Sequence, residues 1–427
     1  MNILLKNALL RDGSIGCVAI TGKRIAYIGA EAGLTADTRF DEVIDCGRSL
    51  LLPGLYNCHT HAAMTLFRGY GEDLPLQSWL NDRIFPAEDR LTDEAVYVAS
   101  LWAIAEMLRG GIVSFSDMYM FCPQTARAAL ETGVKANISR SLVSFDPDAD
   151  FRTDFRFLES KSLFEAYNGA DDGRILIDMS LHAEYTNVGR AVEFLSDYAA
   201  QVKTGMHVHL SETEREHAEC IARHGVTPAR FFADRGAFDV PATAAHCVWV
   251  SEEDRALLAE KGVSAAHNPT SNLKLGSGVM PLPAMLRAGV NVTLGTDGAA
   301  SNNTLDLFKE MHLAAILHKG VEHDTTNTPA ADILRMATAN GAIAQHRPDC
   351  GRLEAGCRAD LILVDMDSIN NIPSYDPIYT AIYSARSTDV RLTMADGKIL
   401  YRDGEFTTID FEKLKQDMRD VCARYFQ

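Results

Sequence analysis

Hydrophobic and polar positions follow three successive patterns along the chain. In the first fifty residues, short apolar runs alternate with turn dipeptides such as Asp12-Gly13. This pattern is typical of strands joined by tight turns. The predicted strands are residues 3–9, 17–21, 24–28 and 42–45. We expect them to form a small antiparallel sheet that carries no catalytic side chains.

From Leu51 onward, an apolar run of strand length, a loop and a helical segment follow one another repeatedly. The predicted strands are residues 51–61, 112–117, 135–143, 174–182, 205–212, 242–246, 262–268 and 290–297. The predicted helices are residues 91–109, 126–132, 155–167, 191–202, 214–224, 252–260 and 283–288. Alternating strands and helices indicate parallel strands with crossovers, and eight such strands favour a closed, distorted TIM barrel, (β/α)8.

The last part of the chain returns to strands after two helical segments. Helices are predicted at 306–318, 328–345 and 412–425, and strands at 361–364, 392–395 and 398–401. Asp396-Gly397, between the last two strands, is a hairpin-turn dipeptide. We therefore predict an α/β protein with two domains. The barrel covers residues 54–351, and both chain ends, 1–53 plus 352–427, form a small β-sandwich with a closing helix.

Composition narrows the classes of function. The 427 residues are 47% hydrophobic and 23% charged, which is ordinary for a globular protein, and their formal net charge is −17. Such an acidic chain lacks the basic footprint that nucleic acids and anionic membranes require. The longest apolar stretch, residues 96–108, is broken by Ser100 and Glu106, so no membrane span is expected. A small-molecule substrate is therefore favoured.

Cysteine usage and the first residues of the chain suggest a compartment. The nine cysteines are scattered and form no C-x-x-C pair, which favours a reducing environment over a disulfide framework. The opening MNILLKNALLRDG carries Lys6 and Arg11 among its apolar residues and does not resemble a signal peptide. We expect a cytoplasmic protein.

Metal-ligating side chains gather at the ends of the predicted strands. His59 and His61 lie two residues apart, so a strand presents both on one face. His209 and Asp297 end two later strands, where barrel enzymes place their active sites. Three imidazoles and a carboxylate suit one zinc ion, although Fe²⁺ and Mn²⁺ accept the same ligands. A catalytic zinc keeps a position for water and lowers the pKa of that water.

Other polar residues lie close to these ligands in sequence. Glu212, three residues after His209, could transfer a proton, and His246 could help to deprotonate a water molecule. A surface salt bridge for Glu212 and a core position for His246 are the alternatives. His207 is expected to support the ligands by packing, and Asn272 to shape the site or a turn. The fourth strand, RILIDMSLHAEY, has no lysine that could bridge two metals, which favours a single ion.

Several motifs carry a family resemblance. They are LLPGLYNCHTHAAMTLFRGYGEDLPLQSWL, HVHLSE, AAHCVWV, HNPTSNLKLGSG and LGTDGAASNN. Together they resemble the amidohydrolase superfamily of metal-dependent hydrolases (ATZ/TRZ type), and within it the 5′-methylthioadenosine/S-adenosylhomocysteine deaminases. The likeness runs from about residue 51 to 303 and resumes at GRLEAGCRADLILVD.

The resemblance implies hydrolytic deamination of the adenine ring, which gives the inosine analogue and ammonia. It implies that His59, His61, His209 and Asp297 hold the metal. Glu212 would then protonate the ring nitrogen, while His246 and Asp297 activate the water. It also implies a homo-oligomer, either a dimer or a tetramer.

Substrate contacts follow from the same resemblance. Glu88 matches a carboxylate that binds the ribose hydroxyls, and His182 matches a histidine that meets the purine ring. Trp79 would form an apolar wall, unless it only packs in the core. Arg140 matches a residue that binds the amino-acid carboxylate of S-adenosylhomocysteine. Arg152 is a second candidate for that role, in a stretch that aligns loosely.

One departure and two alternatives keep the substrate open. Glu184 stands two residues after His182, where the family usually has proline, and it adds a charge near the pocket. Adenosine, methylthioadenosine and other aminated purines therefore all stay candidates. A related hydrolase could instead act on guanine, a pterin or a chlorinated triazine. A non-catalytic scaffold is the alternative from another class, and the complete ligand set argues against it.

Overall fold

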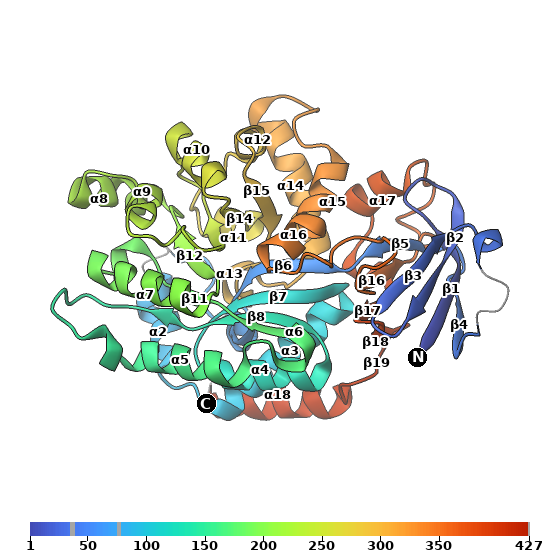
Figure 1. Cartoon of the computed structure of the whole chain (residues 1–427), viewed down its shortest axis with the longest axis horizontal. Coiled ribbons are helices and arrows are strands. Elements are labelled where there is room, and N and C mark those ends of the chain that lie inside the picture. The colour runs from blue at the N-terminus through green and yellow to red at the C-terminus, as the bar shows by residue number, and fades with distance from the viewer. Residues whose placement is uncertain (35–38, 75–77, 426–427) are drawn as a thin grey trace.

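The computed structural model describes residues 1–34, 39–74 and 78–425 of the chain. One mixed sheet built from both chain ends lies at one side, and two parallel sheets with surrounding helices fill the rest (Figure 1). The α/β class predicted from the sequence is confirmed. No helix in the described ranges combines the length and apolar character that a bilayer crossing requires.

The two parallel sheets hold the strands that end in polar residues. The first has the order β10-β8-β7-β6 and the second the order β15-β14-β13-β12-β11-β9. The strands of the first sheet are β6 (Leu55–Thr60), β7 (Ile112–Met118), β8 (Lys135–Ser139) and β10 (Ile175–Ile177). The strands of the second are β9 (Ser141–Leu142), β11 (Met179–Leu181), β12 (Met206–Leu210), β13 (Ala242–His246), β14 (Ser264–His267) and β15 (Asn291–Leu294).

Two predicted strands are divided between these sheets. The run 135–143 forms β8 and β9 with a break at Arg140, and the run 174–182 forms β10 and β11 with a break at Asp178. Asp178 accepts a hydrogen bond from Asn137 Nδ2 (3.0 Å), and its backbone N–H donates to Ile138 O (3.2 Å). These bonds hold the bend at which the fourth strand passes from one sheet to the other.

The predicted strand 51–61 is also two strands. β5 (Leu50–Pro53) pairs with β16 (Leu361–Val364) in the mixed sheet, and β6 begins after Gly54. A Cβ atom at Gly54 would lie 2.5 Å from both methyl groups of Val113. Glycine therefore lets the chain pass closely over β7 as it leaves one sheet for the other.

The mixed sheet has the order β19-β18-β17-β16-β5-β1-β2-β3, with β4 also paired to β1. Its remaining strands are β1 (Asn2–Leu9), β2 (Ile15–Thr21), β3 (Arg24–Gly29), β4 (Glu42–Asp45), β17 (Val390–Ala395), β18 (Lys398–Arg402) and β19 (Glu405–Phe406). Because β4 and β5 both run parallel to β1, the purely antiparallel arrangement expected for residues 2–50 is wrong. The Asp396-Gly397 hairpin is confirmed, since Ala395 pairs with Lys398.

Helices cover the outer faces of the parallel sheets (Figure 1). α3 (Asp93–Arg109) begins at Thr92, whose Oγ1 accepts a hydrogen bond from the Ala95 N–H (3.2 Å). The other long helices are α4 (Cys122–Thr132), α5 (Phe155–Tyr167), α7 (Gly189–Val202), α8 (Glu214–His224), α10 (Glu252–Glu260), α14 (Leu307–Glu322) and α18 (Phe411–Tyr425). The predicted helix 328–345 is broken at Thr338 into α15 (Ala330–Ala337) and α16 (Ala339–Ala344).

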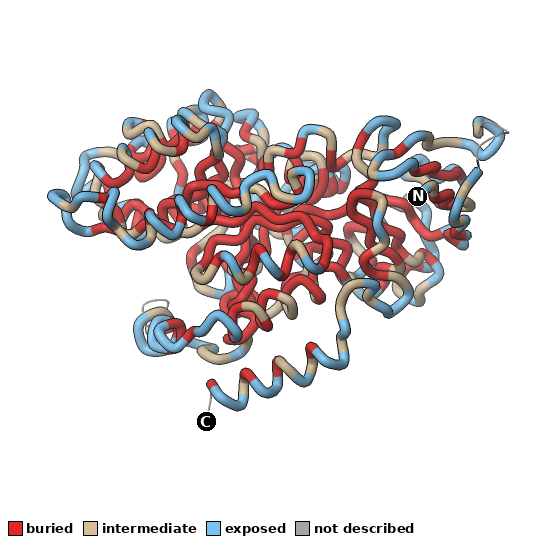
Figure 2. The backbone as a smooth tube through the Cα atoms, turned by 60° about the horizontal axis from the view of Figure 1, so that its bottom comes forward, coloured by how far each residue is buried: buried red, intermediate tan, exposed pale blue. Residues whose placement is uncertain are grey.

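Several short helical segments escaped prediction. They are the π-helical turn η3 (Trp79–Ile84), α2 (Phe85–Glu88), α9 (Pro228–Ala233), α11 (Pro269–Lys274) and α17 (Pro377–Tyr383). Predicted helix 283–288 is confirmed as α12 (Leu282–Arg287). Every residue of β6 and β7 is buried, and buried residues concentrate in the centre of the molecule (Figure 2). Strands enclosed on both faces are typical of parallel sheets covered by helices.

Candidate metal centre and substrate pocket

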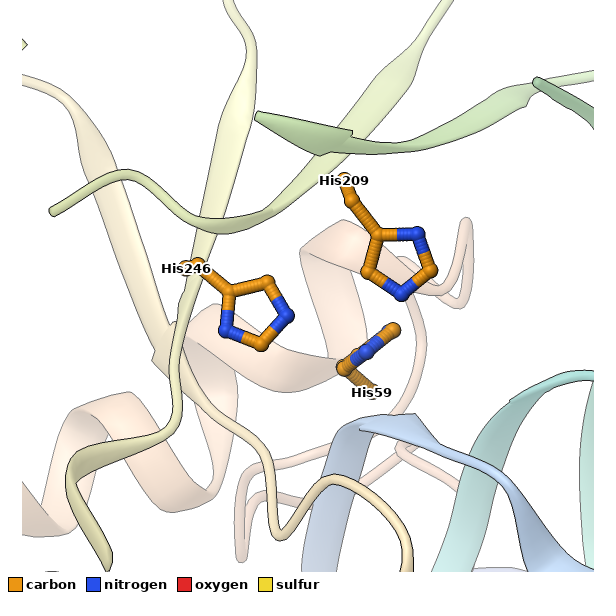
Figure 3. Close-up of side chains that lie close together, drawn as sticks. All are labelled: His59, His209 and His246. Atoms are coloured by element: carbon orange, nitrogen blue, oxygen red, sulfur yellow. The ribbon is translucent and has the colours of Figure 1, made fainter. Parts of the chain in front are cut away.

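The polar residues predicted at strand ends come together in one place. His59 lies near the end of β6, His209 on β12, and His246 ends β13. Their rings face one another across a small space (Figure 3). His61 follows β6 by one residue, and Asp297 follows β15 by three. Carboxyl ends of neighbouring parallel strands share one edge, which brings these distant residues together.

Distances between the donor atoms are those of a metal-binding cluster. Ligand atoms of His59, His209 and His246 lie within 4.8 Å of one another, as do those of His59, His61 and Asp297. Asp297 Oδ1 is 3.2 Å from His61 Nε2 and 3.6 Å from His59 Nε2. The two groups share His59, and the ring centres of His61 and His209 lie 5.5 Å apart, so the four predicted ligands and His246 lie close together.

Hydrogen bonds on the far side of the rings set which nitrogen faces the cluster. His61 Nδ1 donates to Met118 O (2.5 Å), and His209 Nδ1 donates to His182 O (2.8 Å). Because a carbonyl oxygen only accepts, Nδ1 of each ring carries a proton, and in the neutral form of the ring Nε2 is the nitrogen with the lone pair. His59 Nδ1 lies 3.1 Å from His207 Nε2. His207 thus contacts a predicted ligand, in agreement with its expected supporting role.

The environment of one buried nitrogen, His59 Nε2, shows whether a metal fits. His59 Nε2 is fully buried and has no hydrogen-bond partner among the described residues. Buried polar atoms in folded proteins almost always have partners, so this lone pair is placed for a ligand. Imidazole nitrogens and a carboxylate within reach of one point are a zinc donor set. The residues fit a single divalent ion.

Electrostatics favour the ligating forms of three of these groups. Burial lowers the pKa of His59 and of His209 well below the ordinary value, which keeps both rings neutral. Burial alone would raise the pKa of Asp297, but the hydrogen bond and charge of His61 hold it well below the ordinary value. Two neutral imidazoles and an ionised carboxylate are the forms that bind a metal.

Glu212 stands next to this cluster in a fixed loop. Its Oε2 lies 4.0 Å from His246 Nε2, and its Oε1 accepts a hydrogen bond from Ser277 Oγ (3.0 Å). Glu216, which is buried, accepts from the backbone N–H groups of Ser211 (2.9 Å) and Glu212 (2.7 Å). Burial and then the charge of Glu212 raise the pKa of Glu216 to about 7. The carboxyl group of Glu216 therefore holds the backbone at Ser211 and Glu212 in place.

A pocket of about 460 Å³ opens over the cluster, and its walls include His61, His209, Glu212, His246 and Asp297. Four of the five predicted substrate-binding residues, Glu88, Trp79, His182 and Arg140, also line it. The fifth prediction is not supported. Arg152 is absent from the pocket walls, and its exposed side chain pairs with Asp150 (2.9 Å) in the short helical turn η4 (Phe151–Thr153).

Comparison with known proteins identifies the family of the chain. The model of the amidohydrolase family matches residues 50–400. This chain belongs to the amidohydrolase family. Its relatives include the 5-methylthioadenosine/S-adenosylhomocysteine deaminase of Acetivibrio thermocellus, which is 40% identical over 99% of each chain. The 5'-deoxyadenosine deaminase of Methanosarcina mazei is 43% identical over 99% of this chain and 98% of its own.

A solved structure gives the same picture. The crystal structure of an adenosine deaminase from Xanthomonas campestris, with bound zinc, superposes with a TM-score of 0.92 and 33% identity. It covers 99% of this chain and 98% of its own. Zinc at the centre of this amidohydrolase is therefore consistent both with its own donor set and with a related structure.

The charged residues in the pocket of this amidohydrolase have different hydrogen-bond partners. Glu88 is nine-tenths buried and accepts a hydrogen bond from Tyr119 Oη (2.7 Å), and burial raises its pKa. Arg140 Nε donates to Glu159 (2.7 Å), so part of its charge is balanced. Tyr119 follows β7, so its position after a strand end was a signal that sequence reasoning passed over.

Arg156 is a pocket residue that the sequence did not single out. It lies in the first turn of α5 and lines the pocket beside Arg140. Its guanidinium group sits 4.4 Å from the centre of the Phe155 ring and forms no ion pair with any described residue. Burial, and then the charge of Arg140, lower its pKa. The available signal was the recurrence of arginine in FRTDFRF, where only the earlier one drew attention.

The unusual Glu184 is neutralised outside the pocket. Its buried carboxylate accepts hydrogen bonds from Arg223 Nη2 (2.7 Å) and His224 Nε2 (2.8 Å) on α8. Glu184 is absent from the pocket walls, whereas the neighbouring His182, Tyr185 and Thr186 line them. The charge therefore ties the loop after β11 to α8 instead of facing a substrate. Burial, together with nearby imidazoles, lowers the pKa of His182 to about 4, so that ring stays neutral.

Proposed function

We propose that this amidohydrolase removes the amino group of an adenosine-type nucleoside by hydrolysis and releases ammonia and the inosine analogue. Its candidate substrates are 5′-methylthioadenosine, S-adenosylhomocysteine and adenosine. One observation carries the proposal: a single pocket of about 460 Å³ is lined by Glu212, Glu88 and four members of the His/Asp cluster, which are His61, His209, His246 and Asp297. That volume lies within the usual range for small-molecule sites. Relatives named for deaminases of these nucleosides, at near full length, support it.

His59, His61, His209 and Asp297 would hold the metal, most simply one zinc ion per chain. Fe²⁺ and Mn²⁺ share these ligands. Such an ion, when bound, acts as a Lewis acid and makes water a nucleophile near neutral pH. His207 would hold the ring of His59 in place through its 3.1 Å contact with Nδ1.

The residues around the cluster would move the protons. His246 Nε2 faces the same space as the ligands and would take the proton from the attacking water. Asp297 would accept a hydrogen bond from that water and orient it. Glu212 would donate a proton to the ring nitrogen next to the amino-bearing carbon. The amino group would then take the proton held by His246 and leave as ammonia, while the hydroxyl proton returns to Glu212 and the ring keeps a carbonyl group.

Binding of the nucleoside would use the outer part of the pocket. Glu88, fixed by Tyr119, would accept hydrogen bonds from the ribose hydroxyls. The neutral His182 would meet the purine ring, and Trp79, which is buried, would provide an apolar wall. The two guanidinium groups of Arg140 and Arg156 would face the group attached at the 5′ position of the ribose.

The sequence pattern and the contacts between strands also support a proposal for the domain architecture around the site. We infer a closed, distorted (β/α)8 barrel at residues 54–351 and a β-sandwich accessory domain at 1–53 plus 352–427. Two hydrogen bonds, Asp297 N–H to His59 O (2.9 Å) and Thr296 N–H to Asn57 Oδ1 (3.0 Å), support closure between the last and first strands. Homo-oligomer formation and a cytoplasmic location stay predictions.

A substrate screen with metal analysis tests the function. Purified chain loaded with zinc should release ammonia from at least one of adenosine, methylthioadenosine and S-adenosylhomocysteine, with loss of adenine-type absorbance. Glu212→Gln should lose that activity while it keeps its zinc, because the residue is outside the ligand set. Turnover of guanine, a pterin or a chlorinated triazine, with no nucleoside converted, would instead favour the other heterocycles. Absence of bound metal and of all turnover would favour a scaffold.

A further inference from the structure

The segment after β14 contacts each of the three residues that the proposed function assigns to proton transfer and water orientation. Ser271 Oγ donates to Asp297 Oδ2 (2.6 Å). His246 Nδ1 lies 2.8 Å from Asn272 Oδ1. Ser277 completes the set through its 3.0 Å bond to Glu212 Oε1. All three contacting side chains are buried, with exposed fractions of 0, 1 and 4%.

In each contact, the segment binds the atom that points away from the reaction centre. Ser271 holds Asp297 Oδ2, while Oδ1 is the oxygen next to His61 and His59. Ser277 holds Glu212 Oε1, while Oε2 is the oxygen that approaches His246. The three contacts therefore leave the reacting atoms free and fix the orientation of each group.

The contact to His246 also selects a tautomer. Two amide groups approach His246 Nδ1: Asn272 Oδ1 at 2.8 Å and Asn268 Nδ2 at 3.4 Å. The shorter contact is with an oxygen, which only accepts, so it favours the proton of His246 on Nδ1. Nε2, which faces the ligand cluster, then carries a free lone pair. With the opposite tautomer, Nε2 would carry a proton and have no lone pair to accept another from water.

The backbone at the same residues explains why such support is needed. His246 has φ 73° and Asp297 has φ 59°, both in the left-handed region that non-glycine residues rarely adopt. Strained residues persist only where the surroundings hold them. The supporting segment is itself anchored, because Thr270 N–H donates to Glu310 (3.0 Å) and Trp249 Nε1 donates to Ser277 O (2.8 Å).

We propose that residues 271–277 are a positioning segment, in which Ser271, Asn272 and Ser277 orient Asp297, His246 and Glu212 without reacting themselves. The inference rests on the proposed function, because the three oriented residues have their roles there. It adds to it the residues that keep the proton-transferring groups aligned.

Kinetics of single variants test the proposal first. Ser271→Ala, Asn272→Ala and Ser277→Ala should each lower kcat roughly 10- to 100-fold, with KM changed by less than about threefold, because misplaced reacting groups slow chemistry more than binding. Bound zinc should stay at the wild-type level. Ser196→Ala is the matched control, since among the described residues that buried hydroxyl bonds only Val192 O, within α7. Unchanged kcat in all three variants, or losses that follow loss of zinc, would overturn the proposal.

A measurement without turnover separates this proposal from the function. Nitrogen NMR of histidine-labelled, zinc-loaded protein should show His246 protonated at Nδ1, with the signal assigned by its absence in His246→Gln. Asn272→Ala should alter that tautomer, whereas Asn272→Asp, which keeps an acceptor oxygen, should preserve it. If no nucleoside is deaminated but the tautomer responds in this way, the substrate assignment fails and the positioning role stands. A wild-type His246 protonated at Nε2 instead would refute the role of Asn272.

Discussion

At the scale of single residues, two arginines four positions apart have very different surroundings. Arg156 lines the pocket and has no ion-pair partner among the described residues, whereas Arg152 is exposed and paired with Asp150. An unpaired guanidinium group at the wall of a pocket favours an anionic part of a ligand. S-Adenosylhomocysteine carries a carboxylate there, and methylthioadenosine does not.

Arg156→Ala should therefore change substrate preference. We expect KM for S-adenosylhomocysteine to rise by roughly 10- to 100-fold, the equivalent of one charge-assisted hydrogen bond, with little change for methylthioadenosine. Steady-state kinetics on both substrates measure the effect. Arg152→Ala is the control and should leave both values unchanged. Equal effects on the charged and uncharged substrates would contradict a carboxylate contact.

His346 offers a prediction about pH. Its Nε2 lies 3.4 Å from Asp178 Oδ1. Burial alone would lower the pKa of His346, but its contact with the negatively charged Asp178 raises it above the ordinary value. A raised pKa in the folded state means that the protonated ring adds stability below about pH 6.5, and that this contribution is lost as pH rises through the folded value.

His346→Gln should accordingly be most destabilising in mildly acidic buffer. The difference in thermal midpoint between wild type and variant should be largest below about pH 6 and shrink toward pH 9. Thermal unfolding across that range, followed by circular dichroism, gives the comparison. A difference that does not vary with pH would show that the charged pair is unimportant.

The ligand cluster could be predicted from the sequence because its signals are local. His59 and His61 are spaced for one strand face, and His209 and His246 lie at the ends of apolar runs. Arg152 lies outside the pocket lining and belongs to a loop region, where no periodicity indicates which side chain turns inward. The contacts of Ser271 and Ser277 could not be predicted from the sequence either. Their partners, Asp297 and Glu212, lie 26 and 65 residues away in the chain.

At the scale of elements, the packing of α16 against β6 determines how the first two histidines are presented. A Cβ atom at Gly341 would lie 2.5 Å from Tyr56 Cβ, 3.2 Å from Cys58 Sγ and 3.3 Å from Thr293 Oγ1. Glycine is thus required by contact with the strand that carries His59. Gly320 in α14, in contrast, has nothing within 4 Å of such an atom.

Alanine at these two glycines should have opposite effects. Gly341→Ala should lower the free energy of unfolding by about 1–3 kcal/mol through overpacking. Gly320→Ala should raise it by about 0.5–1 kcal/mol, because alanine favours a helix and meets no neighbour. Chemical denaturation of both variants provides the test. A similar change in both would mean that helix propensity outweighs packing at residue 341.

The limits of sequence reasoning at this scale follow from the three divided strands. Breaks at Gly54, Arg140 and Asp178 leave the apolar pattern almost uninterrupted, although each marks a change of sheet or of pairing partner. Periodicity reports which residues are buried, and it contains no information about which strand lies alongside. The helix caps were easier to predict, as at Thr92, because their hydrogen bonds are local.

At the scale of the whole molecule, a buried ion pair joins the parallel sheets to the mixed sheet. Lys135 of β8 contacts Asp360, next to β16, and lies 2.8 Å from Asp396 in the β17–β18 hairpin. All three side chains are buried. The charge of Lys135 offsets the effect of burial and keeps the pKa of Asp360 below its ordinary value. A buried carboxylate without its partner is costly.

Lys135→Met should therefore destabilise the fold by about 3–5 kcal/mol, since it leaves Asp360 and Asp396 without a neighbouring lysine. Thermal unfolding measures the loss. Lys6→Met is the control, because Lys6 is only partly buried and lies 3.9 Å from the exposed Asp45, and it should change stability by less than about 0.5 kcal/mol. Comparable midpoints for the two variants would show that the buried pair contributes little.

The pairing of β5 with β16 has a consequence for biosynthesis. Tyr56, near the start of β6, donates a hydrogen bond to Asp360, 304 residues further along the chain. His59 and His61 are therefore synthesised long before β16, the strand that pairs with the neighbouring β5. Until then, the apolar segment LLLP of β5 has β1 on one side but lacks its partner β16 on the other. The edge of β5 that pairs with β16 thus stays open until the chain is more than four-fifths made, and chains cut short before residue 361 would lack that pairing altogether.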